Sequence, residues 1–124
     1  MIQLRSKLYI VDNSGAKIIR CIKVIGKSNQ KYGYISDLIW GTVKKSRLKV
    51  KRKVYKRVLY KVIIIQTKKE YRRLNGEIIR FPLNAGILID NSNKLMSTRI
   101  FGSIPRELRY KNYLKTISLA AKII

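Results

Sequence analysis

The sequence predicts a mainly β protein, a small closed barrel that carries loops and two short helices at its C-terminal end. Short runs rich in Ile, Val and Tyr fill the first two thirds of the 124 residues, and turn-forming residues separate them. The last quarter changes to residues that suit helices. Such strands form a barrel or a sandwich, and at this length a closed barrel is favoured because it leaves no exposed edge.

Six runs are expected to be strands. Several of them alternate well enough to give one wet face; Arg20, for example, separates Ile18 from Ile22. The predicted strands are residues 8–11, 18–25, 35–43, 58–67, 77–81 and 85–89.

The separators have turn chemistry. Residues 12–15, 27–29, 74–77 and 90–93 combine Asn, Asp and Ser with Gly or other residues that tolerate positive φ. Asn75-Gly76 is the dipeptide preferred in type I′ turns. We therefore predict a tight hairpin over residues 72–81.

The C-terminal part is predicted to hold two helices, over residues 106–109 and 113–121. Leu114, Ile117 and Ala121 are spaced three and four apart, as on one face of a helix. No repeat and no low-complexity linker divides the chain. We expect a single domain over residues 1–124, with the barrel over about 1–95 and the helical and loop region over about 96–124.

Charge indicates the class of partner. The chain has 29 Lys and Arg against six Asp and Glu, a formal net charge of +23. Self-repulsion of this size opposes folding unless a polyanion neutralises it, and nucleic acid fits best. A membrane surface is the weaker alternative, because the sequence shows no strongly amphipathic helix, lipidation signal or signal peptide. Its apolar runs, such as residues 62–65, are far short of the roughly 20 residues that span a bilayer.

Basic residues gather in three places, where we expect RNA phosphate contacts. Residues 44–57 contain nine Lys or Arg and no acid, and a solvated loop is the alternative interpretation. Four more cations lie at the predicted hairpin, and a looser set follows it. The candidates are Lys44, Lys45, Arg47, Lys49, Lys51, Arg52, Lys53, Lys56 and Arg57; Lys68, Lys69, Arg72 and Arg73; and Arg80, Arg99, Arg106 and Arg109.

Aromatic residues allow a second kind of RNA contact. Tyr32, Tyr34, Tyr55 and Tyr71 lie in or beside basic loops, where rings can stack on unpaired bases. Ordinary packing with a wet hydroxyl is the alternative for each. Trp40 is expected in the core or at its rim.

Catalytic groups are scarce. The chain has no His, and its acids, including Asp12 and Glu107, are scattered one at a time. We expect Asp12 to form a turn, Glu107 to lie near a helix start, and the single Cys21 to be a buried strand residue. The sequence therefore predicts a protein that is not an enzyme and has no cofactor or metal; a nuclease with acids assembled by the fold is the alternative.

Several strings are similar to one family. They are MIQLRSKLYIVDNSGAKIIRCIKVIG, QTKKEYRRLNGEIIRF, NAGILIDN, STRIFGSIPRELR and ISLAAKII. In this order and spacing they resemble the universal ribosomal large-subunit protein fourteen family over essentially the whole chain. The resemblance implies a five-stranded barrel and a structural constituent of the large ribosomal subunit.

The resemblance also implies partners and site residues. The partners are large-subunit rRNA, small-subunit rRNA across the intersubunit face, large-subunit proteins three and nineteen and, in many lineages, a ribosome-silencing factor. Matched positions are Asp12–Lys17, Thr67–Arg73 and the C-terminal signature around Thr98 and Arg99, which adds Lys17 to the expected phosphate contacts.

Departures from the family concern contacts and compartment. Arg57-Val58 stands where the family usually has Gly-Asp, so a differently built turn is expected, and Lys122 replaces a usual acid. The extra positive charge and a bias to Ile, Lys and Asn suggest an organelle-encoded member in the mitochondrial matrix, with plastid and bacterial cytoplasm as alternatives. A free RNA-binding regulator or chaperone remains the alternative function.

Overall fold

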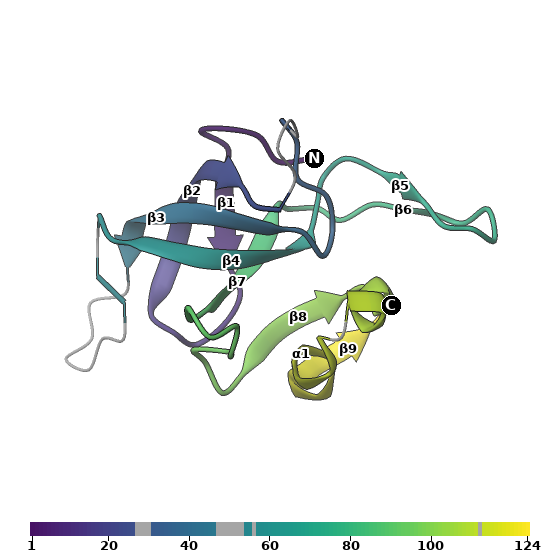
Figure 1. The fold of residues 1–124 in the computed structure, drawn as a ribbon. Helices are drawn as coiled ribbons and strands as arrows, with labels where there is room; N and C mark the ends of the chain where they lie inside the picture. Colours follow the sequence, from purple (N-terminus) through teal and green to yellow (C-terminus); the bar gives the residue numbers. More distant parts are fainter. Residues whose placement is uncertain (27–30, 47–53, 56, 112) are drawn as a thin grey trace.

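A closed barrel of five strands forms the body of the protein (Figure 1). The computed structural model describes residues 1–26, 31–46, 54–55, 57–111 and 113–124. Around the barrel the order is β1-β2-β3-β4-β7, and the prediction of a mainly β protein with a five-stranded barrel and two short helices is confirmed. The five strands are β1 (Lys7–Ile10), β2 (Ala16–Val24), β3 (Leu38–Ser46), β4 (Leu59–Gln66) and β7 (Ala85–Ile89).

The barrel closes through one parallel pair. β1 and β7 run parallel, and the four other neighbouring pairs are antiparallel. Two glycines let the walls approach closely. A Cβ on Gly86 would lie 2.6 Å from Val62 Cγ1, and one on Gly41 would lie on the side chain of Ile19. Any larger residue at either position would push neighbouring strands apart.

The run of apolar residues in β4 has both faces buried. Val62 and Ile64 point into the barrel core, whereas Ile63 and Ile65 belong to a second cluster outside it. The second cluster contains Ile104 from the C-terminal region. Because the C-terminal region covers the outer face of β4 and β7, these strands are continuous apolar runs and do not alternate.

A turn explains where β3 begins. The predicted strand at 35–43 starts three residues later, at Leu38, because residues 34–37 form a turn. The Asp37 carboxylate accepts a bond from the backbone N–H of Tyr34 at 2.9 Å, and Ser36 has a φ of 72°. Such geometry ends strand pairing. The predicted turn at 27–29 lies outside the described residues.

The C-terminal region contains a parallel strand pair that the sequence did not predict. Its elements are β8 (Ile100–Ile104), the 3₁₀ helix η1 (Arg106–Lys111), α1 (Leu114–Leu119) and β9 (Ala120–Ile123), with β8 parallel to β9. The second predicted helix was therefore too long: it ends at Leu119, and the last residues form a strand. The pairing with β8 overrides the helix-compatible composition of the tail, and a pairing between distant segments leaves no local periodicity.

A hairpin projects from the barrel body between β4 and β7 (Figure 1). We call residues 68–80 the arm; it contains β5 (Tyr71–Arg72) and β6 (Ile78–Ile79). The hairpin was predicted, but its turn is not type I′. The N–H of Gly76 bonds the Arg73 carbonyl, the N–H of Arg73 bonds the Glu77 carbonyl, and of Asn75 and Gly76 only Gly76 has positive φ. This is a three-residue loop with glycine at the left-handed position.

Candidate nucleic-acid interface

The first group of predicted cations lies at one end of the barrel. Lys44 and Lys45 are at the end of β3, Lys17 is in β2 beside them, and Arg57 precedes β4. Register brings them together, since Ile18 of β2 pairs with Lys45 and the Arg57 N–H bonds the Val43 carbonyl. All four side chains are exposed, and we call them the barrel-end group. Six other predicted residues of this stretch lie outside the described residues: Arg47, Lys49, Lys51, Arg52, Lys53 and Lys56.

Arg57 has the backbone conformation of a glycine. Its φ is 66°, in the left-handed region that costs an L residue about 1–2 kcal/mol. The sequence predicted a differently built turn because Arg57-Val58 replaces Gly-Asp. At this position the chain has a left-handed residue with a cationic side chain.

The second group lies on the arm. Lys68, Lys69, Arg72 and Arg80 are exposed there. Lys69 Nζ lies 3.2 Å from the exposed carboxylate of Glu70, a contact of little energetic weight. The backbone N–H of Lys68 bonds Asn84 Oδ1 at 2.9 Å and fixes the root of the arm. The arm therefore presents cations on a projecting ribbon.

Arg73 differs from the other arm cations. Its side chain is 8% exposed and forms an ion pair with Glu107 of η1. It also donates to the Ile124 carbonyl at 2.7 Å, and the Tyr71 hydroxyl donates to Glu107 at 3.1 Å. We call Arg73, Glu107 and Tyr71 the clamp, because they join the arm to η1 and the chain terminus. In this structure the Arg73 guanidinium is engaged inside the protein.

The third group is carried by the C-terminal region. Arg99 precedes β8, and its N–H bonds Asn13 Oδ1 at 3.2 Å. The Asn13 amide also exchanges two bonds with Thr98, so the first turn of the chain positions this segment. Arg106 and Arg109 are exposed on η1. Two sequence motifs more than 80 residues apart thus lie in contact.

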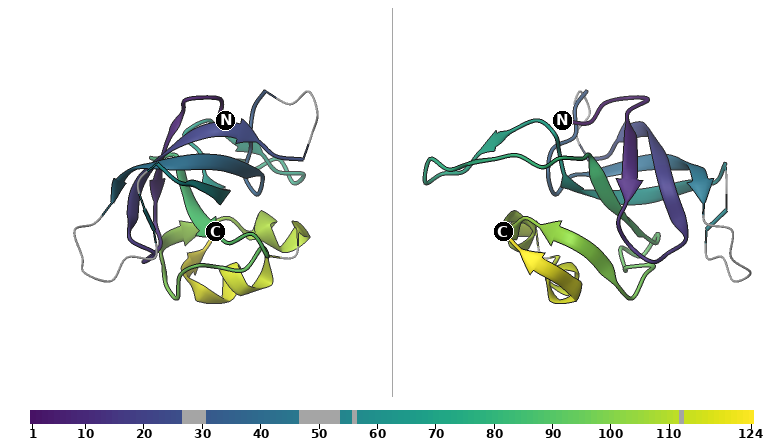
Figure 2. Two further views of the ribbon diagram at one scale, coloured as in Figure 1. Left: turned by 60° about the vertical axis from the view of Figure 1, so that its left-hand side comes forward. Right: turned by 180° about the vertical axis from the view of Figure 1, so that it is seen from behind.

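Charge on the described surface is largely uncompensated. Ion pairs between described residues engage Lys69, Arg73, Arg106 and Lys111. The barrel-end group has none, nor have Lys68, Arg72, Arg80, Arg99 and Arg109 of the second and third groups. The end of β3 and the arm lie at opposite ends of the molecule (Figures 1 and 2). The predicted cations therefore form separate basic surfaces and not one patch.

Acidic residues are used structurally. Asp12 is fully buried; one carboxylate oxygen accepts the N–H of Ser14 and the other the N–H of Leu88, both at 3.0 Å. The prediction that Asp12 forms a turn is confirmed, and the residue also ties the turn to β7. Within the described ranges no three His, Cys, Asp or Glu side chains gather as metal ligands.

Cys21 is a buried residue of β2, as predicted. Burial raises the pKa of its thiol to about 11, so the group is neutral near physiological pH. No helix within the described part of the chain is both long enough and apolar enough to span a bilayer.

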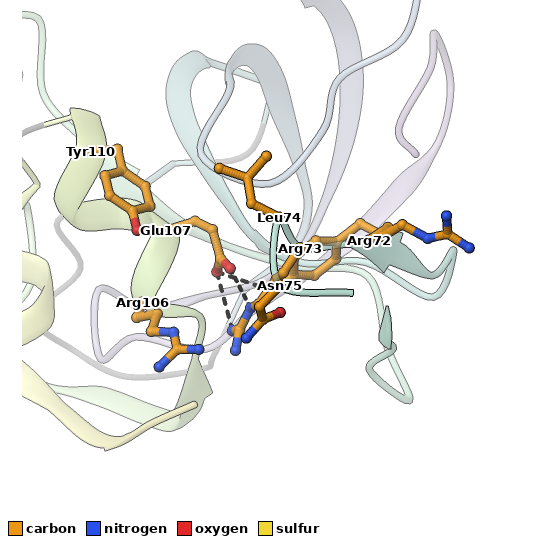
Figure 3. A pocket seen from close by; sticks show the side chains of 8 residues that line it. Arg72, Arg73, Leu74, Asn75, Arg106, Glu107 and Tyr110 are labelled. Atoms are coloured by element: carbon orange, nitrogen blue, oxygen red, sulfur yellow. Dashed lines mark hydrogen bonds and ion pairs between the residues drawn. The ribbon is translucent and has the colours of Figure 1, made fainter. Parts of the chain in front are cut away.

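Two exposed residues beside the clamp were missed by sequence reasoning. Leu74 at the arm tip is fully exposed, and Tyr110 of η1 is 83% exposed. With Arg106 and the clamp they line a groove of about 500 Å³ (Figure 3). Of the tyrosines that the sequence singled out, Tyr71 is half-buried in the clamp, whereas Tyr34 and Tyr55 are exposed. The sequence places Tyr110 between Arg109 and Lys111, but its position beside Leu74 of the arm depends on the fold, and no local pattern indicates it.

Comparison with known families agrees with this arrangement. The family model described as ribosomal protein L14p/L23e matches residues 1–124, the full length of the chain. This family consists of structural proteins of the large ribosomal subunit. The chain belongs to the ribosomal protein L14p/L23e family.

Proposed function

We propose that this chain is a structural constituent of the large ribosomal subunit and binds large-subunit rRNA through its exposed Lys and Arg. The observation that carries the proposal is the set of exposed cations, at both ends of the molecule, that have no ion pair with another described residue. Phosphate contacts of this kind position a protein on folded RNA and need no base reading. A formal charge of +23 makes binding strongly favourable through counterion release.

The two basic surfaces suit a protein that joins separate RNA segments. The end of β3, which carries Lys44 and Lys45, and the arm lie at opposite ends of the closed barrel (Figure 2). A single RNA helix would engage one of them, whereas a composite site in folded rRNA engages both. The six basic residues in 47–53 and at 56 belong to the proposed interface by sequence.

We further propose a position at the face that meets the small subunit. The support is the family, whose members contact small-subunit rRNA and neighbour large-subunit proteins three and nineteen. Contact with a ribosome-silencing factor is the weakest part of the proposal, because Lys122 reverses the usual charge near the chain end. On the same support we propose that the chain is one domain over residues 1–124 and has no catalytic activity. Its composition favours a mitochondrial ribosome over one of plastid or bacterial cytoplasm.

Gradient fractionation tests the proposal. Native lysate of the source compartment is separated at moderate and at high salt, and the chain is detected in each fraction. We expect it to travel with the large subunit in both conditions, because a composite site holds it beyond simple charge attraction. If the chain stays at the top of the gradient, it is a free RNA-binding protein.

A further inference from the structure

The groove between the arm and η1 has the composition of a nucleotide site. Figure 3 shows the Leu74 side chain and the Tyr110 ring above the Arg73–Glu107 pair, with Tyr110 farther to the left. Both residues are among the most exposed large apolar side chains of the described chain. Covering these side chains with a bound group would be favourable, since burial of apolar surface is stabilising.

The charge of the groove favours an anionic occupant. Arg73 and Glu107 neutralise one another at its floor. Arg106 keeps a half-exposed guanidinium whose contact with Glu77 is long, at 4.0 Å, and Arg72 flanks the other side. A volume of about 500 Å³ is that of pockets which hold small ligands. An acidic protein segment would satisfy the charge, but it would leave the flat Tyr110 ring without a matching planar group.

We propose that this groove holds one unpaired nucleotide of rRNA, with its base stacked on Tyr110 and against Leu74 and its phosphate at Arg106. Single-stranded bases are recognised by stacking on aromatic rings, with cations at the backbone. The inference rests on the proposed function and adds to it: the phosphate contacts elsewhere are insensitive to base pairing, whereas this contact requires a base outside a helix. The clamp sets the width of the groove, because it fixes the arm to η1.

Variants at position 110 separate stacking from charge. Tyr110→Ala removes the ring and Tyr110→Phe keeps it. Tyr9→Ala removes an exposed ring of β1 that does not line the groove. Tyr110 is largely exposed, so its removal should leave the fold intact, as a thermal melt would verify. Leu74→Asp is a second variant, which places a negative charge where the base would lie.

Binding of each full-length chain to a large-subunit rRNA transcript is measured together with base-specific chemical probing of that RNA. We expect Tyr110→Ala to weaken binding about 5- to 100-fold and to expose one unpaired base that the wild-type chain protects. Tyr110→Phe and Tyr9→Ala should behave as the wild type. The salt dependence should be unchanged, because no phosphate contact is lost.

Two results would overturn the inference. If Tyr110→Ala and Leu74→Asp bind with wild-type affinity and protections, the groove does not hold a nucleotide, and a neighbouring protein is its occupant. If the lost protections lie only in paired helices, stacking is not the contact. Failure of the wild-type chain to bind the transcript at all would instead contradict the proposed function.

Discussion

The barrel and the arm are stabilised in different ways. The barrel is a closed ladder of backbone hydrogen bonds around fully buried side chains such as Leu8, Ile39 and Ile64. The arm has two strands of two residues each and an exposed tip, and it is attached to the C-terminal region through Arg73 and Glu107. Apolar burial thus maintains the scaffold, while polar contacts of the clamp and of the arm's root orient the projecting cations.

The largest difference in stability between the barrel and the arm should appear when apolar side chains are truncated. Ile64→Ala in the barrel core removes a fully buried side chain and should lower the free energy of unfolding by about 2–5 kcal/mol. Ile78→Ala in the arm, where the side chain is 60% exposed, should change it by less than about 0.5 kcal/mol. Urea denaturation followed by circular dichroism measures both. Equal losses would mean that the arm is part of the cooperative core.

Glycine substitution distinguishes steric from conformational cost. Gly86→Ala places a Cβ 2.9 Å from the Ile63 carbonyl oxygen, which cannot move without the strand, and should cost about 1–3 kcal/mol. Gly76→Ala at the arm turn meets nothing within 4 Å but retains a φ of 91°, so about 1 kcal/mol is expected. Urea denaturation measures the loss in free energy of unfolding for both variants. A larger loss for Gly76→Ala than for Gly86→Ala would contradict close packing of the barrel wall at Gly86.

A double-mutant cycle measures the clamp. Arg73→Met and Glu107→Gln, singly and together, should give a coupling free energy of about 1–3 kcal/mol, because the pair is largely shielded from water. The exposed pair of Lys69 and Glu70 is the control and should give less than about 0.5 kcal/mol. Limited trypsin digestion should cut the arm faster in the Arg73 and Glu107 variants. Unchanged cleavage would show that the arm is held by other contacts.

A smaller change in the free energy of unfolding is expected at Arg57. Arg57→Gly should raise the free energy of unfolding by about 1 kcal/mol, because glycine adopts the observed φ of 66° without strain. Arg57→Ala removes the same charge without this relief and is the matched control. A gain for both variants would show that charge repulsion, and not backbone strain, is what the substitution removes.

The smallest effect on stability is expected from Cys21. A thiol whose pKa is raised by burial to about 11 should react with a thiol reagent at pH 8 only after unfolding. The pKa is higher in the folded chain, so raising the pH above 9 should favour the unfolded state. Modification followed by mass spectrometry, with and without urea, checks this. Rapid labelling of the native chain would place Cys21 outside the core.

Local patterns in the sequence predicted the strands and turns that depend on neighbouring residues alone. The run 85–89 was placed correctly because β7 is continuous and apolar, and Asn75-Gly76 predicted a turn. Strands β8 and β9 were missed because their pairing joins segments about 20 residues apart. The prediction for Arg73 took no account of its partner Glu107, 34 residues away. Tyr110 was missed for the same reason, since the fold brings it beside Leu74, 36 residues away in the sequence.

The most direct test of site-specific rRNA binding compares two sets of three charges. The arm variant has Lys68, Arg72 and Arg80 changed to Gln. The control variant has the exposed Lys7, Lys23 and Lys31 changed to Gln; these three residues lie outside the proposed interface. Log affinity falls as log salt concentration rises. We predict that the arm variant reduces the magnitude of this negative slope by about two, while the control variant keeps the wild-type slope. Equal reductions in both chains would contradict a defined interface and would indicate that net charge alone binds the RNA.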